Sequence, residues 1–146
     1  LWSITPRGSI CRLPAVTCVH PLITLLEKLD AITRRFPRRD LEPAAFARHY
    51  EDAARVILRL ADFGAVRGGH RALARAMHAK HQLRTLVRFD DAALNPTSGD
   101  RWAAVSAAHA ALASMFWAPQ MPLSEATRII REWLAEQPLT DDDAVT

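Results

Sequence analysis

The stretch from His20 to Leu60, HPLITLLEKLDAITRRFPRRDLEPAAFARHYEDAARVILRL, predicts two amphipathic helices joined by a basic loop that contains proline. Pro21 suits the first position of a helix, and leucine and isoleucine recur after it at helical spacing. The prolines at 37 and 43 end one helix and open the next. We therefore expect helices over 21–36 and 43–60, and a fold built around this pair.

The remainder of the chain continues the helical pattern. Apolar residues recur at three- and four-residue intervals in three further segments, which are separated by stretches rich in glycine and proline. These segments predict helices over 70–87, 100–117 and 124–136. The sequence as a whole therefore predicts a mainly α protein, a bundle of five to six helices.

Only the N-terminal residues look extended. Ser9–Leu13 and Ala15–Val19 are rich enough in β-branched residues to form short strands. Two short strands are marginal by themselves, so a strand pair here suggests the edge of a sheet whose other strands are missing. We expect 1–20 to be the remnant of a sheet, 21–137 a helical domain, and 138–146 an acidic tail with frayed structure.

Composition narrows the class of protein. The chain has 146 residues, 49% of them hydrophobic and 24% charged, with a net charge of +3. No apolar run approaches the roughly 20 residues of a membrane span, and the N-terminus does not resemble a signal peptide. Cys11 and Cys18 lack metal-ligand spacing, which favours reduced, buried thiols. We expect a cytoplasmic protein that does not contact a membrane.

Two charged residues lie beside the apolar stripes of the first helix pair. Lys28 flanks the stripe of the first helix, and Asp52 flanks that of the second, four residues after Arg48. If Lys28 and Asp52 belong to one site, their side-chain ends should meet on one face of the helix pair. The alternatives are a surface lysine that pairs with Glu27 or Asp30, and a surface aspartate that pairs with a neighbouring arginine.

The motifs of this helix pair resemble those of a known family. HPLITLLEKLDAITRRFP followed by FARHYEDAARV is similar, in order and spacing, to the C-terminal half of the AbiEii/AbiGii toxins, nucleotidyltransferases of bacterial toxin–antitoxin systems. The later segments ARAMHAKHQLRTL and LNPTSGDRWAAVSAAHAALASMFWAPQMPLSEATRIIREW resemble the closing region of that family. The resemblance covers about Pro21 to Glu136 and implies the C-terminal part of a nucleotidyltransferase-like α+β protein, with 1–20 left from its sheet.

The resemblance also implies a chemistry and partners. Lys28 and Asp52 match catalytic motif positions, and Glu27, Arg48 and His49 match neighbouring positions that would bind substrate. The family chemistry is transfer of a nucleotide from a nucleoside triphosphate (NTP), with Mg²⁺, onto an acceptor, which for the MenT-like members is the 3′ end of tRNA. The implied protein partner is a cognate antitoxin, and the implied biology is abortive infection, a phage defence.

One departure from the family pattern limits what this chain can do. The Gly-Ser…Asp-x-Asp element that holds metal and triphosphate in the family is missing, and residues 1–19 contain no Asp or Glu. His78 and His81 lie three apart but have no evident third ligand, so we expect no metal site in the chain. The chain is therefore expected to be part of a larger protein and inactive alone.

Two interpretations from other classes remain open. The chain could be a non-catalytic helical module, a degenerate toxin remnant that binds an antitoxin or another protein, with Met115–Trp117 as the contact if exposed. It could also be a basic nucleic-acid-binding bundle, supported only by the arginines expected in one loop: Arg34, Arg35, Arg38 and Arg39. A solvated basic loop explains the same arginines.

Overall fold

The computed structural model describes residues 18–115 and 117–141, and this part of the chain is mainly α-helical, without a strand. The five α-helices are α1 (Pro21–Arg35), α2 (Arg48–Arg59), α3 (Gly69–Ala79), α4 (Asp100–Ala111) and α5 (Leu123–Glu136). The helical class is thus confirmed. Short 3₁₀ turns flank α2 at Pro43–Ala45 and Leu60–Asp62, and two more lie at Ala92–Leu94 and Ala113–Met115.

The predicted strand pair falls almost entirely outside the described residues. Its last two members, Cys18 and Val19, are described and adopt no regular structure. The thiol of Cys18 is exposed, so the prediction of a buried cysteine is wrong at this position. Cys11 lies outside the described part.

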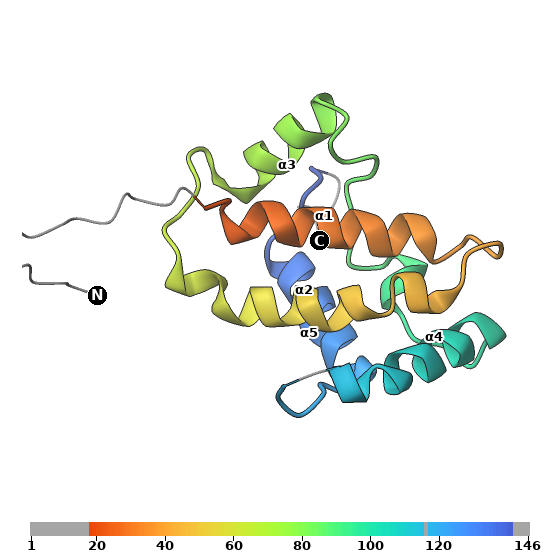
Figure 1. Cartoon of the computed structure of the whole chain (residues 1–146). Coiled ribbons are helices and arrows are strands. Elements are labelled where there is room, and N and C mark those ends of the chain that lie inside the picture. The colour runs from red at the N-terminus through yellow and green to blue at the C-terminus, as the bar shows by residue number, and fades with distance from the viewer. Residues whose placement is uncertain (1–17, 116, 142–146) are drawn as a thin grey trace, which may run out of the picture.

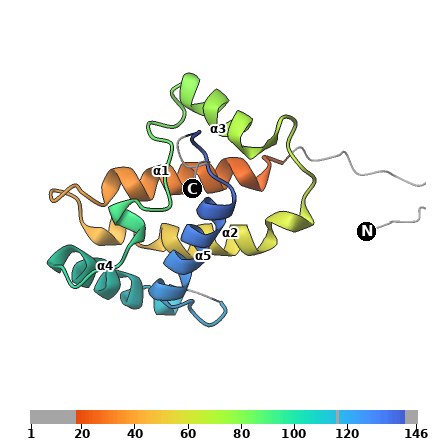
Figure 2. The same ribbon diagram turned by 180° about the vertical axis from the view of Figure 1, so that it is seen from behind.

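The hydrophobic core lies between α2 and the two helices that pack against it, α1 and α5. Figures 1 and 2 show α1 and α2 side by side and antiparallel, with α5 crossing α2 steeply on the other side. α3 lies along the outer side of α1, and α4 lies beyond α2. The fully buried side chains come mostly from the three central helices and include Leu25, Leu29, Ile32, Phe46, Tyr50, Ile130 and Leu134. The predicted apolar stripes of 21–36 and 43–60 supply the first five of these.

The start of α1 is fixed by His20. Its Nδ1 accepts a hydrogen bond from the backbone N–H of Leu22, at 3.2 Å, which caps one of the unpaired donors of the first turn. Its other ring nitrogen, Nε2, lies 2.8 Å from the carbonyl oxygen of Gly64. One histidine therefore ties the beginning of α1 to the segment that follows α2.

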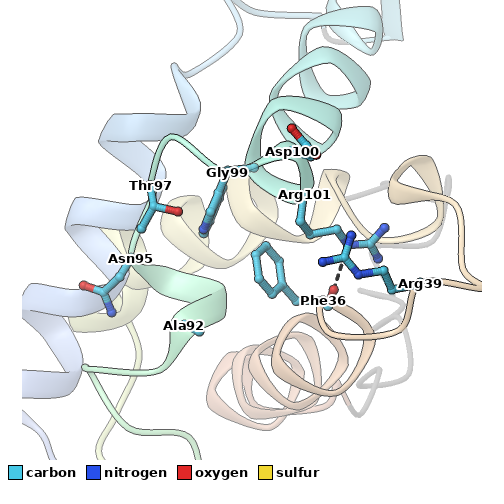
Figure 3. A pocket seen from close by; sticks show the side chains of 9 residues that line it. Phe36, Arg39, Ala92, Asn95, Thr97, Gly99, Asp100 and Arg101 are labelled. Carbon is cyan, nitrogen blue, oxygen red and sulfur yellow. Dashed lines mark hydrogen bonds between the residues drawn. The ribbon is translucent and has the colours of Figure 1, made fainter.

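The end of α1 is fixed by Arg101, which the sequence did not single out. Its guanidinium donates to the carbonyl oxygens of Phe36 (2.7 Å), Arg38 (2.8 Å) and Leu41 (3.2 Å), and it lies 5.3 Å from the centre of the Phe46 ring. Figure 3 shows this side chain reaching from the first turn of α4 to the Phe36 carbonyl, beside a pocket of about 260 Å³. Arg101 thereby satisfies carbonyls that the end of a helix leaves unpaired.

The third helix is shorter than predicted. α3 ends at Ala79 instead of continuing to residue 87, because His81 adopts a left-handed conformation with φ 58°. The N–H of Gln82 then donates back to the carbonyl of Met77 at 2.9 Å, the pattern of a Schellman C-cap. Since this position normally favours glycine, the histidine gave no signal of a helix end in the sequence.

The carboxylate of Asp30 binds the segment that follows α3, where the sequence predicted further helical turns. Its Oδ1 accepts from the backbone N–H groups of Arg84 (2.9 Å) and Thr85 (3.0 Å) and from the Thr85 hydroxyl (3.1 Å). Asp30 itself is buried on α1. A buried carboxylate is stable here because several donors replace its water.

The prediction of a frayed acidic tail is wrong for residues 138–141. Leu139 is buried in the core, and the carbonyl of Pro138 accepts from Arg71 at 3.2 Å. Asp141 forms ion pairs with Arg71 and Arg75 of α3. The chain after α5 is therefore packed against α3 up to this point, and the remaining tail residues lie outside the described part.

Candidate functional site

Lys28 and Asp52 form an ion pair that bridges α1 and α2. The Lys28 Nζ lies 2.7 Å from Asp52 Oδ2, and the two side chains are only 21% and 22% exposed. The prediction that their side-chain ends meet is confirmed. The alternative pairing of Lys28 with Glu27 or Asp30 is not what the structure shows. A role of this pair in catalysis stays a prediction.

Asp52 is shared with a second cation. The Nε of Arg48, one helical turn earlier on α2, lies 3.5 Å from the same Oδ2 of Asp52. Arg48 is mostly exposed, so this contact contributes little to stability. Two cations around one carboxylate leave the cluster with a net positive charge on the face where α1 and α2 meet.

His49 completes the cluster as a neutral group. Its Nε2 lies 3.5 Å from Nη1 of Arg35, while its Nδ1 is buried without a hydrogen-bond partner among the described residues. Burial lowers the pKa of His49, and the positive charges of Lys28 and Arg35 lower it further against the opposing effect of Asp52. The ring is therefore uncharged at neutral pH, and its Nε2 is placed to accept a hydrogen bond from the Arg35 guanidinium.

Glu27 is not brought to this cluster. It is exposed and lines a different pocket, of about 250 Å³, together with Met77 and Lys80 on the α3 side of α1. Adjacent residues of a helix point about 100° apart, so Lys28 faces α2 while Glu27 faces α3. Of the five predicted site residues, the structure gathers Lys28, Arg48, His49 and Asp52.

The predicted basic loop is divided between two elements. Arg34 and Arg35 belong to the last turn of α1, and only Arg38 and Arg39 lie in the loop. Arg34 lies 3.4 Å from Asp30, and Arg38 lies 2.7 Å from Asp40, so nearby carboxylates offset part of the charge. Because these arginines are divided between two elements and partly neutralised, they form a weaker basic surface for nucleic acid than four arginines in one loop would.

A pocket of about 240 Å³ opens beside Asp52. It is lined by polar residues of α2 and by apolar residues that follow α4, namely Arg48, Asp52, Arg55, Leu112, Met115 and Trp117. Asp52 thus belongs both to the ion pair with Lys28 and to the wall of this pocket. The candidate site is accordingly continuous with a hollow that could receive a ligand or a partner.

Glu51 is a buried acid that sequence reasoning did not assign to any role. It is fully buried, and its Oε1 accepts from Arg55 Nε at 2.8 Å and from the backbone N–H of Met121 at 3.1 Å. Its Oε2 has no hydrogen bond in the described part and lies 3.7 Å from Nε2 of His109. The sequence signal for this ion pair was the four-residue spacing of Glu51 and Arg55, which places them one helical turn apart.

The buried His109 predicts a pH dependence of stability. Burial lowers the pKa of His109 below its ordinary value of 6.5, against the smaller opposing effect of Glu51, and the pKa of His49 is lowered as well. As pH falls below about 6.5, the unfolded chain binds protons before the folded chain does, so the free energy of unfolding should fall. Urea unfolding between pH 8 and pH 5 measures this loss.

The variant His109→Gln provides the control for that pH dependence. Glutamine keeps a hydrogen-bonding group near Glu51 but does not titrate, so the fall in stability below pH 6.5 should be shallower. A wild-type stability that rises from pH 7 to pH 5.5 would contradict the assignment.

No metal site accompanies the cluster. Within residues 18–115 and 117–141, no group of three or more His, Cys, Asp or Glu side chains is placed to hold a metal ion. The carboxylate of Asp52 is already paired with Lys28 and Arg48. Because Mg²⁺ takes oxygen ligands and carboxylates, this cluster does not fit it. What the two cations, Lys28 and Arg48, do fit is an anion such as phosphate.

Comparison of the chain with protein-family models, with curated proteins and with solved structures finds no match in any of the three. Among the described helices, none combines the length and apolar character needed to cross a membrane.

Proposed function

We propose that this chain is the helical C-terminal part of an AbiEii-like nucleotidyltransferase toxin of a bacterial toxin–antitoxin system. In the complete protein it would act in nucleotide transfer from an NTP to an acceptor such as tRNA. The observation that carries the proposal is the 2.7 Å pair between Lys28 and Asp52, because it joins the two helices whose motifs resemble the family. In this proposal Mg²⁺ would be held by carboxylates of the complete protein that this sequence does not contain.

The cluster supports this role by its charge and its position. The ammonium of Lys28 would stabilise negative charge on the phosphates of the nucleotide, an effect that is strong where water is partly excluded. Asp52 would hold that ammonium in place and orient the hydroxyl of the acceptor. Arg48 would add charge-assisted hydrogen bonds to the same anion.

The experiment is a nucleotide-transfer assay on the full product of the reading frame that contains this sequence. Radiolabelled NTPs, Mg²⁺ and tRNA are supplied, and label in the RNA is measured. We expect Lys28→Met to lower the rate by about 10²-fold or more, the loss typical of a removed charge-stabilising group. Asp52→Asn should lower it as well, because the lysine loses its ionic partner.

Lys80→Met is the matched control, since Lys80 is the other lysine of the chain and lies exposed at the end of α3. It should retain the wild-type rate. Lys28→Met leaves Asp52 beside Arg48, so the fold should persist and far-ultraviolet circular dichroism should be unchanged. No labelling of any RNA by the wild-type protein would refute the function, and an unimpaired Lys28→Met variant would refute the site.

A non-catalytic protein-binding module is the second candidate. The observation that favours it is the exposure of Met115 and Trp117, which the sequence suggested as a contact if exposed. In this candidate the binding partner would be an antitoxin or another protein. Retention of partner binding by Lys28→Met, together with the absence of transfer activity in the wild-type protein, would favour it over the enzyme.

A further inference from the structure

The pocket beside Asp52 lies on the surface between α2 and the chain that follows α4. One wall is the solvent-facing side of α2, with Arg48, Asp52 and Arg55, and the other is the chain that follows α4. Further along α2, Leu58 and Arg59 are also exposed. We call the surface formed by Arg48, Asp52, Arg55, Leu112, Met115 and Trp117 the α2–α4 groove.

The apolar wall of the α2–α4 groove is unusual for a surface. The indole of Trp117 is fully exposed, and Met115 exposes 63% of its area. Large apolar side chains gathered on a surface mark contact sites more often than single exposed ones do. Tryptophan, methionine and arginine are also enriched at protein interfaces, and tryptophan and arginine dominate their binding energy.

The polar wall carries the charge that defines the partner. Arg48 is mostly exposed, and within the described part of the chain its guanidinium has one ion-pair contact, at 3.5 Å from Asp52. Arg55 pairs with the buried Glu51 and donates to the Pro119 carbonyl, yet keeps 44% of its side chain exposed. With Lys28, which also pairs with Asp52, three cations meet the two carboxylates of Asp52 and Glu51, so one net positive charge remains beside the groove.

We infer that the α2–α4 groove docks an acidic peptide segment of another protein. An aromatic or aliphatic side chain of the segment would fill the pocket against Trp117 and Met115. One or two carboxylates would pair with Arg48 and Arg55. Charge complementarity thus selects the partner, and the exposed indole supplies most of the affinity.

A peptide fits this groove better than a nucleic-acid strand does. A strand brings a phosphate with each nucleotide, and the two guanidiniums that line the groove offer too few partners for such a run of charges. Binding of successive bases also needs several aromatic platforms, and among the residues that the structure describes Trp117 is the only aromatic one lining the groove. The inference does not depend on the proposed enzyme activity, although a docked segment would cover Arg48 and Asp52 of the candidate site.

The test is selection from a displayed library of random peptides on the purified chain. We expect enriched peptides to combine acidic residues with an aromatic or large aliphatic residue. Affinities are then measured by fluorescence anisotropy for the wild type and for variants. Trp117→Ala and Arg48→Glu should each weaken binding by about tenfold or more, as for residues at the centre of an interface.

Phe63→Ala is the matched control, because Phe63 is an exposed aromatic residue that lines a different pocket. It should bind like the wild type. Replacing the peptide's acidic residues by lysine should restore binding to Arg48→Glu, which identifies the charge contact. Failure to enrich a shared pattern, or equal binding by Trp117→Ala, would overturn the inference. The inference would also be overturned if a single-stranded RNA oligonucleotide bound more tightly than any peptide and lost its binding in Trp117→Ala.

Discussion

Replacing Arg101 by alanine should lower the free energy of unfolding by about 3 kcal/mol, because several carbonyls lose their donor together. The guanidinium donates to the carbonyls of Phe36, Arg38 and Leu41 and packs on the ring of Phe46. Without this guanidinium, the backbone carbonyls at the end of α1 and in the following loop have only water as a hydrogen-bond donor. Urea unfolding monitored by circular dichroism measures the loss.

Two variants test whether the geometry of the guanidinium is responsible. Arg101→Lys keeps a charge but cannot reach all the carbonyls at once, so its loss should lie between those of wild type and Arg101→Ala. Arg128→Ala removes an exposed arginine whose partner is Glu132, and it should cost no more than about 0.5 kcal/mol. Equal losses in Arg101→Ala and Arg128→Ala would show that Arg101 does not organise the loop.

Replacing Asp30 by alanine should also lower the free energy of unfolding by about 3 kcal/mol. The carboxylate is buried and accepts from the backbone N–H groups of Arg84 and Thr85 and from the Thr85 hydroxyl. Its removal leaves these donors without their acceptor beneath the segment after α3. Hydrogen exchange at Arg84 and Thr85 should accelerate, which locates the damage within the fold.

Asp30→Asn separates the hydrogen bonds from the charge. The amide retains an oxygen that can accept from the same N–H groups, so it should cost less than alanine and protect both amides partly. Asp62→Ala is the control, because Asp62 is an exposed partner of Arg59 only. An Asp30→Ala protein as stable as Asp62→Ala would contradict the role assigned to the carboxylate.

The helices that carry the site could be predicted from local patterns. Pro21, the apolar stripe after it and Pro37 define α1 closely, since the signals lie within the helix itself. The second helix was predicted to start at 43, whereas the residues up to Ala45 form a 3₁₀ turn before α2 begins at Arg48. Such differences at helix ends are ordinary, because the last turns depend on their neighbours.

Features that depend on distant contacts could not be predicted. α3 ends early partly because Asp30, more than fifty residues away in sequence, binds the N–H groups of Arg84 and Thr85. The segment at 138–141 is ordered because α3 provides Arg71 and Arg75 for Asp141. Neither contact leaves a periodic signal, so local reasoning assigned a longer helix and a frayed tail.

The candidate site was predictable in part. Lys28 and Asp52 flank the stripes of neighbouring helices, and their side-chain ends lie 2.7 Å apart, as expected if they belong to one site. The same reasoning could not exclude Glu27, whose position on α1 faces α3. It also missed Glu51, because a charged residue beside an apolar stripe is more often at the surface than fully buried.

We propose that the Lys28–Asp52 pair faces phosphate, and the two lysines of the chain allow this to be measured directly. Reductive methylation with ¹³C-formaldehyde keeps the charge of both side chains and gives each its own methyl resonance. Titration with inorganic tripolyphosphate and with ATP should shift the Lys28 resonance saturably and leave that of Lys80 nearly unchanged. A Lys28 resonance that does not move, or that moves no more than that of Lys80, would contradict the claim.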